Sequence, residues 1–237
     1  MKKMILFNVF IFLQFMASAQ EQVWYDDHAI QRSLEGDFKS ISISGSIKLV
    51  LSQSEKTGIA VSAADLSYQE QIITEIVNNT LMIYASKNRW KGAGKTATVY
   101  LSYKMIHSIL ASGASSVNLV GDVRLPHLKI SLSGASKLKA HLYGTSLTLS
   151  LSGASEATIA GKTGSLQLVC SGASDLNGFD MQAETCTVVA SGASDVKIRV
   201  NKELKAVASG ASHIYYGVNA TITDIKSTGA SKVEKKY

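Results

Sequence analysis

The stretch SLSGASKLKAHLYGTSLTLSLSGASEATIAGKTGSLQLVCSGAS, from Ser131 to Ser174, contains the tetrad Ser-Gly-Ala-Ser three times. Tetrads of this kind, the last with threonine in first place, are centred on seven glycines: Gly113, Gly134, Gly153, Gly172, Gly192, Gly210 and Gly229. The spacings are 21, 19, 19, 20, 18 and 19 residues. A period of about 20 residues is typical of solenoids, because each unit can bury its apolar face only by stacking on its neighbours.

The residues around each tetrad indicate what a unit contains. The fourth residue before each glycine is always apolar, and the fifth is always polar. Apolar residues also stand four places after the glycines: Val117, Leu138, Ala157, Leu176, Val196, Ile214 and Val233. Alternation with period two is the pattern of a half-buried strand. We therefore predict an all-β fold, a right-handed single-stranded parallel β-helix with rungs of about 20 residues, in which the seven glycines are structural corners.

The chain before the regular repeat is irregular but is also rich in strands. The segment GDFKSISISGSIKLVLSQ, which begins at Gly36, contains a degenerate tetrad around Gly45. IITEIVNNTLMIYAS indicates a hairpin with its turn at Asn78-Asn79, although its first part, from Asp65, is compatible with a helix. We expect one β-helix domain over residues 20–237, with irregular N-terminal strands and a hairpin in 20–105 and seven regular rungs in 106–237.

The first 19 residues have the three parts of a secretory signal peptide. Lys2 and Lys3 precede an apolar run, and Ala17-Ser18-Ala19 fits an A-x-A cleavage site. We expect export to the periplasm, the outer cell surface or the medium, and no transmembrane segment, because no later apolar run is long enough. Without residues 1–19 the charge is 24 − 2 basic against 18 acidic residues, or +4. This mild excess does not indicate nucleic-acid binding.

The two cysteines fall at different positions within their rungs. Cys170 lies two residues before Gly172, whereas Cys186 lies six residues before Gly192. On adjacent rungs they are therefore offset by four residues, or about 13 Å at about 3.3 Å per residue. A disulfide requires Cα atoms within about 7 Å, so we predict two buried free thiols.

The order of these segments resembles a known family. The strands from GDFKSISISGSIKLVLSQ, then ITEIVNNTLMIYAS, then VYLSYKMIHSILASGAS and the SGAS rungs are similar to the "putative auto-transporter adhesin, head GIN domain" family, which has no defined function and is common in Bacteroidetes. The similarity extends from about Gly36 to Lys232. It implies a right-handed β-helix with a signal peptide and an adhesin role, and it supplies no catalytic residues. This chain has Asn-Asn at a turn where glycine is usual in the family.

Two groups of residues are candidates for a binding surface. Three places after the glycines stand Ser116, Lys137, Glu156, Asp175, Asp195, His213 and Lys232, so Glu156, Asp175 and Asp195 should stack on consecutive rungs. Such a column is compatible with solvated carboxylates, with a calcium or glycan site, or with the chemistry of a carbohydrate-active enzyme. The second group is a basic loop with Lys87, Arg89, Trp90 and Lys91, compatible with a solvated loop or with contact to anionic glycans or lipid headgroups.

Other motifs argue against catalysis. The tetrads lack the G-x-S-x-G order of a nucleophile elbow, and the histidines have no common spacing to them. GAGKT at 92–96 lacks the first glycine of a P-loop and precedes a strand pattern. We expect an exported, non-catalytic module without a cofactor, whose partner is a glycan or another component of an envelope or host surface. The alternatives are a carbohydrate-active enzyme using the carboxylate column and a purely structural envelope protein.

Overall fold

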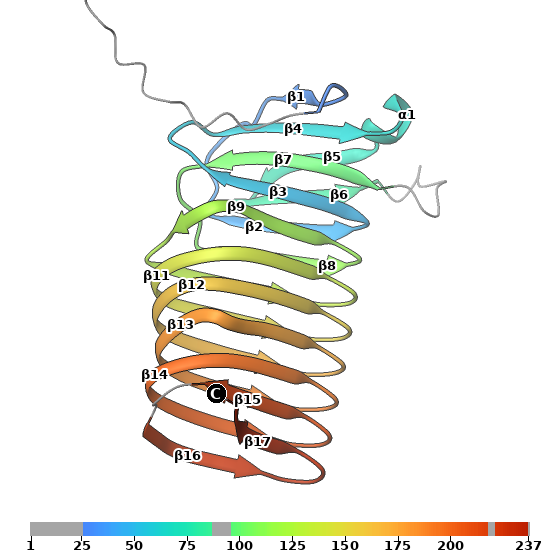
Figure 1. Ribbon diagram of the computed structural model, residues 1–237. Coiled ribbons are helices and arrows are strands. Elements are labelled where there is room, and N and C mark those ends of the chain that lie inside the picture. Colours follow the sequence, from blue (N-terminus) through green and yellow to red (C-terminus); the bar gives the residue numbers. More distant parts are fainter. Residues whose placement is uncertain (1–25, 87–95, 218–220, 237) are drawn as a thin grey trace, which may run out of the picture.

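A computed structural model describes residues 26–86, 96–217 and 221–236. The predicted signal peptide (1–19) and the predicted basic loop (Lys87, Arg89, Trp90 and Lys91) lie outside the described residues. The described part consists almost entirely of β-strands that coil around one axis (Figure 1).

The N-terminal elements are β1 (Ile30–Arg32), β2 (Ser40–Gly45), β3 (Ile47–Gln53), β4 (Gly58–Ala63), α1 (Leu66–Gln69), β5 (Ile72–Val77), β6 (Thr80–Ala85) and β7 (Ala97–Tyr103). The regular rungs comprise β8 (Ser108–Gly113), β9 (Ser116–Arg124), β10 (His127–Leu132), β11 (Lys137–Leu151), β12 (Glu156–Cys170), β13 (Asp175–Ala190), β14 (Asp195–Ala208), β15 (His213–Gly217), β16 (Thr221–Ser227) and β17 (Lys232–Lys235).

The strands form two walls that meet at the tetrads. The pre-corner wall contains the strand segments that lead into each tetrad, from β8 through β10 to β16, and the post-corner wall contains those that follow it, from β9 to β17. Within each wall, neighbouring rungs pair in parallel. In Figure 1 the near strands β3 and β9 run left and the far strands β2 and β8 run right while the chain descends, so the coil is right-handed. The predicted β-helix is confirmed.

The parallel register stacks the predicted apolar columns inside the coil. Ile130, Leu149 and Leu168 are direct partners on successive rungs of the pre-corner wall, and each is at most 1% exposed. Cys170 pairs with Ala190, whereas Cys186 pairs with Leu166, four residues further back. Both cysteines are free and buried, as predicted from their offset.

The tetrads form the corner column along one side of the coil. The seven tetrad glycines have φ between +71° and +76°, a region that residues with a Cβ rarely adopt. A Cβ on Gly153 would lie 2.6 Å from the carbonyl oxygen of Gly134, on the rung before it. In five of the seven tetrads the second serine is buried and closes the corner, as its Oγ donates to the carbonyl of the first. These distances are 2.6 to 2.9 Å for Ser115, Ser136, Ser155, Ser194 and Ser212.

The N-terminal strands do not stack in chain order. β2 and β3, with Gly45 between them, form a rung that lies between β6–β7 on one side and β8–β9 on the other. Gly45 pairs with Gly113, so the degenerate tetrad begins the corner column. β5 and β6 form the predicted antiparallel hairpin, with Asn78 and Asn79 at φ +48° and +61°.

This arrangement closes the N-terminal end of the coil. β4 runs antiparallel to β7 and β1 antiparallel to β4, while β5 covers β6 in the same antiparallel sense. The short helix α1 begins at Asp65, whose side chain accepts a hydrogen bond from the Tyr68 backbone, and it buries Tyr68. At the other end β16 and β17 each pair on one side only, with β14 and β15. The two ends of the described coil are therefore different: antiparallel strands and α1 cover one end, whereas the other ends in β16 and β17, which no further element covers (Figure 1).

Candidate functional site

The carboxylate column lies on the outer face of the post-corner wall. Glu156, Asp175 and Asp195 are direct partners on β12, β13 and β14. The column is continued by Lys137 before Glu156 and by His213 after Asp195. Because the first residue after each corner points outward on every rung, the residues that the sequence placed in one column do lie in one row on the surface.

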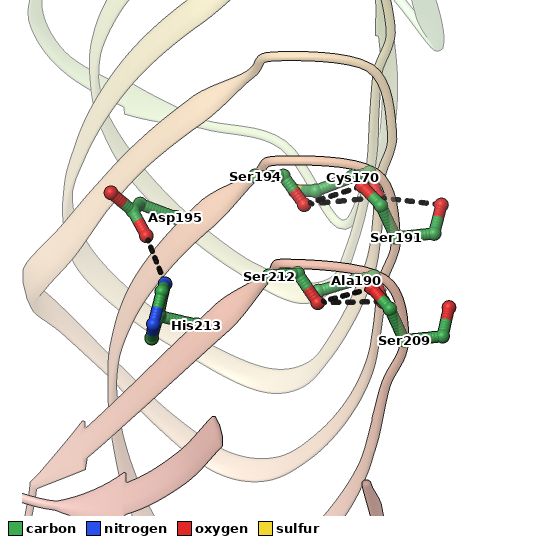
Figure 2. Close-up of polar contacts among 8 residues, drawn as sticks. All are labelled: Cys170, Ala190, Ser191, Ser194, Asp195, Ser209, Ser212 and His213. Atoms are coloured by element: carbon green, nitrogen blue, oxygen red, sulfur yellow. Dashed lines mark hydrogen bonds and ion pairs between the residues drawn. The ribbon is translucent and has the colours of Figure 1, made fainter. Parts of the chain in front are cut away.

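Lys137 and His213 contact the carboxylates at the two ends of the row. Lys137 Nζ lies 2.7 Å from Glu156 Oε2, and His213 Nδ1 lies 3.2 Å from Asp195 Oδ1. Figure 2 shows the Asp195 and His213 side chains directed at each other, away from the tetrad serines. Asp175 has no ion-pair partner within the described ranges, and within the same ranges no cluster of three or more His, Cys, Asp and Glu is close enough to hold a metal ion.

The serines in Figure 2 belong to the scaffold. The Oγ of Ser212 donates to the carbonyl of Ser209 at 2.9 Å and lies 3.2 Å from the carbonyl of Ala190 on the preceding rung. Ser194 repeats this geometry one rung earlier, with Ser191 and Cys170. The Ser194 and Ser212 hydroxyls thus close their own corners and join them to the preceding rung.

A groove of about 510 Å³ crosses the same wall beside the column. Its lining includes Asn118, Asp122, Lys139, His141, Thr158 and Asp180. Lys139 and Thr158 stand two residues after Lys137 and Glu156, so the groove begins about 7 Å along the strands from the column. Glu156, Asp175 and Asp195 themselves are not part of its lining.

Two irregular strands create the hollow. β9 contains extra residues around Val120 and Gly121, so that Asp122 rather than Val120 pairs with His141. On the other side, β13 contains an extra residue around Phe179, so that Asp180 pairs with Ala160. Such bulges redirect side chains and bend strands. Here they flank the regular strands β11 and β12, which form the floor of the groove.

Four side chains at one edge of the groove contact one another, and we call them the His141 cluster: Asp122, Arg124, His141 and Tyr143. His141 Nδ1 lies 2.6 Å from Asp122 Oδ1, and its Nε2 lies 3.5 Å from the Tyr143 hydroxyl. The Arg124 guanidinium is 4.6 Å from the centre of the Tyr143 ring. The His141 and Asp122 side chains are 44% and 50% exposed. The cluster therefore presents donors, acceptors and aromatic rings to solvent in fixed positions.

Sequence reasoning missed this cluster because the bulge in β9 breaks the period. Asp122 stands nine residues after Gly113, whereas His141 stands seven after Gly134. Counting from the glycines therefore assigns the two to different columns. The Gly121-Asp122 pair within a strand pattern is the one signal that could have indicated a bulge.

A second hollow, of about 640 Å³, lies beside the N-terminal cap. Three of its charged groups have structural partners: Arg32 donates to the carbonyl of Gln69 at 2.6 Å and to that of Ile72, and Lys104 lies 2.5 Å from Glu55. Tyr103 also lines it, and burial raises the pKa of its phenol. Because Arg32 holds α1 and β5 in place, we assign this hollow to the cap.

Comparisons with known proteins agree with the fold. The family model described as "Putative auto-transporter adhesin, head GIN domain" matches residues 37–220. No curated protein is detectably similar to the chain. None of the helices in the described ranges is long and apolar enough to span a membrane.

Three solved structures share the architecture. One is a putative adhesin from Bacteroides fragilis NCTC 9343, with 17% identity, TM-score 0.76, and 89% of this chain and 98% of that chain covered. Another is a putative adhesin from Parabacteroides distasonis ATCC 8503, with 18% identity, TM-score 0.68, and coverage of 87% and 97%. A putative lipid binding protein from the same strain has 18% identity, TM-score 0.66, and coverage of 87% and 96%. At these identities the likeness concerns the fold alone.

Proposed function

Because the chain belongs to the "Putative auto-transporter adhesin, head GIN domain" family, we propose that it is an exported, non-catalytic module that binds a surface glycan through its post-corner wall. The observation that carries this proposal is the groove beside the carboxylate column, with the His141 cluster along one edge. In this proposal residues 1–19 direct export and residues 20–237 act as one unit.

The chemistry of the groove is suited to sugar hydroxyls. Asp122 and Asp180 supply acceptors, Lys139 supplies a donor, and Asn118 supplies both. Beside the groove, Tyr143 offers an aromatic ring with one face on Arg124. The groove crosses four successive strands of an open wall. This shape suits an extended chain of sugars better than a compact small molecule.

We propose that the carboxylate column extends the same site. Glu156 and Asp195 are held by Lys137 and His213, while Asp175 lies between two other carboxylates. Like charges directly opposite each other on neighbouring strands repel. A basic or cation-bridged glycan bound there would relieve this repulsion. Lys87, Arg89, Trp90 and Lys91 remain a predicted second contact.

The same geometry supports our proposal that the module is non-catalytic. The three carboxylates stand in a row on an open face, and the groove that could hold a substrate is lined by other residues. A hydrolase or lyase needs its acid and base on either side of the reacting bond. Incubation with a panel of polysaccharides should therefore yield no product, and turnover that disappears in a Glu156→Gln, Asp175→Asn, Asp195→Asn variant would contradict this part of the proposal.

The binding proposal is tested on a glycan array. The wild-type chain should bind at least one class of glycan, and His141→Ala should weaken that binding about tenfold, because it removes one or two hydrogen-bonding groups. His127→Ala is the matched control, since His127 is an exposed histidine on the pre-corner wall, with its Nδ1 2.8 Å from Ser146 Oγ. Equal loss of glycan binding in both variants would overturn the proposal. So would a wild-type chain that binds lipid vesicles but no glycan on the array.

A further inference from the structure

The open end of the coil exposes side chains that belong to the core columns. Ile222 pairs with Leu204 and Ile225 with Ala206, and both partners are fully buried. Ile222 and Ile225 are nevertheless 45% and 37% exposed, because no further rung of the described residues covers them. Figure 1 shows β16 and β17 at the end of the coil opposite the cap.

The two strand edges at this end also have free backbone groups. The backbone N–H groups of Thr228 and Lys232 donate to Ala208 and Ser212 of the preceding rung. Lys129 and Ser133 of the β10 rung occupy the positions that Asp224 and Thr228 occupy in the β16 rung. Both donate to their preceding rung, so residues four apart in this strand direct their N–H groups to the same side. Since successive residues direct their backbone groups to opposite sides, those of Ile225 and Val233 face the open end. Unpaired edges of this kind are templates for another strand.

The charges on both strands are self-complementary. Ile225 is flanked by Asp224 and Lys226, and Val233 is flanked by Lys232 and Glu234. Each flanking pair already forms an ion pair within its own strand. If a second copy of β16 runs antiparallel with Ile225 opposite Ile225, Asp224 of each copy lies opposite Lys226 of the other. The same operation on β17, about Val233, places Lys232 opposite Glu234.

A single two-fold rotation can pair both β16 and β17 with their counterparts in a second copy. Ile225 stands four residues before Gly229 and Val233 stands four after it, so the two are equally far from the corner, on opposite walls. A single two-fold axis in the plane of the last rung can therefore cross β16 at Ile225 and β17 at Val233. It keeps the core of one copy over the core of the other and forms reciprocal N–H to C=O bonds at both crossing points.

We propose that the open end binds a second copy of this chain, end to end, in a two-fold dimer centred on Ile225 and Val233. The two-fold contact uses the open end of both copies, so the assembly closes at two copies. In the dimer both walls continue from one copy into the other. The post-corner walls, which bear the groove, then lie on one side of an assembly twice as long.

Sedimentation and light scattering of the full chain should give twice the mass of one chain. This measured mass should fall on dilution, as the dimer dissociates. D224K and K226D each place like charges opposite each other twice per dimer, and each should weaken the dimer about tenfold or more. The double variant D224K/K226D restores alternating charges and should restore the dimer. Lys129→Asp, on β10, makes the same charge change as K226D away from the end and should have no effect.

Cross-linking tests the register independently. Ile225→Cys should form a disulfide between copies under mild oxidation, because residues opposite each other in a hydrogen-bonded antiparallel pair have Cα atoms about 5.5 Å apart. Thr223→Cys should not, because Thr223 faces Ser227 of the second copy. A monomer at all concentrations, a charge swap that fails to restore the dimer, or equal cross-linking of the two cysteine variants would overturn the proposal.

Discussion

At the residue scale, the glycine of each corner has two separate reasons to be glycine. Its φ is positive, and in the six tetrads from Gly134 to Gly229 a Cβ would lie within 3 Å of the carbonyl oxygen of the preceding corner. Gly45 and Gly153 separate these reasons. Gly45 has φ +99° and open space within 4 Å of where a Cβ would stand, whereas Gly153 has φ +73° and the Gly134 carbonyl 2.6 Å from that point.

We expect Gly45→Ala to lower the free energy of unfolding by about 1–2 kcal/mol, the cost of a left-handed backbone for a residue with a Cβ. Gly153→Ala should cost about 3 kcal/mol or more, because the clash adds to that strain. Urea unfolding of both variants measures the difference. Equal losses would show that the close approach of the rungs does not restrict the corner.

The two buried thiols give stability a dependence on alkaline pH. Burial raises the pKa of Cys170 and Cys186 from 9.0 to about 12, because it penalises the thiolate. Above pH 9 the unfolded chain releases these protons while the folded chain keeps them, so the free energy of unfolding should fall as pH rises from 9 towards 12. Urea unfolding across that window measures the fall.

The double variant Cys170→Ala, Cys186→Ala is the control for this pH dependence. Its free energy of unfolding should vary less steeply between pH 9 and 12, although Tyr103, a third buried acid with a raised pKa, keeps part of the effect. Rapid alkylation of either cysteine in the folded protein near pH 9 would contradict the expected protection.

At the element scale, regular strands were predictable and their irregularities were not. Alternation around each glycine identified the two inward columns, because the side chains of a strand alternate strictly between core and solvent. The bulge at Val120-Gly121 adds two residues, which keeps the alternation in phase, and the bulge at Phe179 adds one residue, which interrupts it only locally. Counting from the glycines detected neither bulge, nor the groove that they flank.

The turn at Asn78-Asn79 has a backbone geometry that suits glycine better than the asparagines that occupy it. Both residues have positive φ, and the Asn79 carbonyl accepts from the backbone of Lys39 at the start of β2. Asparagine tolerates this region better than most residues, but glycine adopts it without cost. We expect Asn79→Gly to raise the free energy of unfolding by about 0.5–1 kcal/mol and Asn79→Ala to lower it by a similar amount. Thermal and urea unfolding of the two variants would show the opposite signs, and a loss in both would contradict this account.

At the scale of the whole molecule, the period of about 20 residues was sufficient to predict a stack of rungs, but not their order at the N-terminal end. Counting along the chain assumes that consecutive rungs are spatial neighbours. The rung of β2 and β3 instead lies between β6–β7 and β8–β9, so the strands that follow it in sequence cover it from both sides. The surface partner was beyond prediction for another reason: a scaffold pattern specifies the core and leaves the outward residues free to vary.

The interleaved β2–β3 rung has a consequence for how the chain folds. In the regular part, contacts between rungs join residues about 20 apart, such as His127 and Ser146, separated by 19. The contact of Ser40 with Ser108 spans 68 residues. Closing the longer loop costs more entropy and slows folding. We therefore expect the placement of the β2–β3 rung to be the slow step of folding, whereas each later rung can add to a finished template.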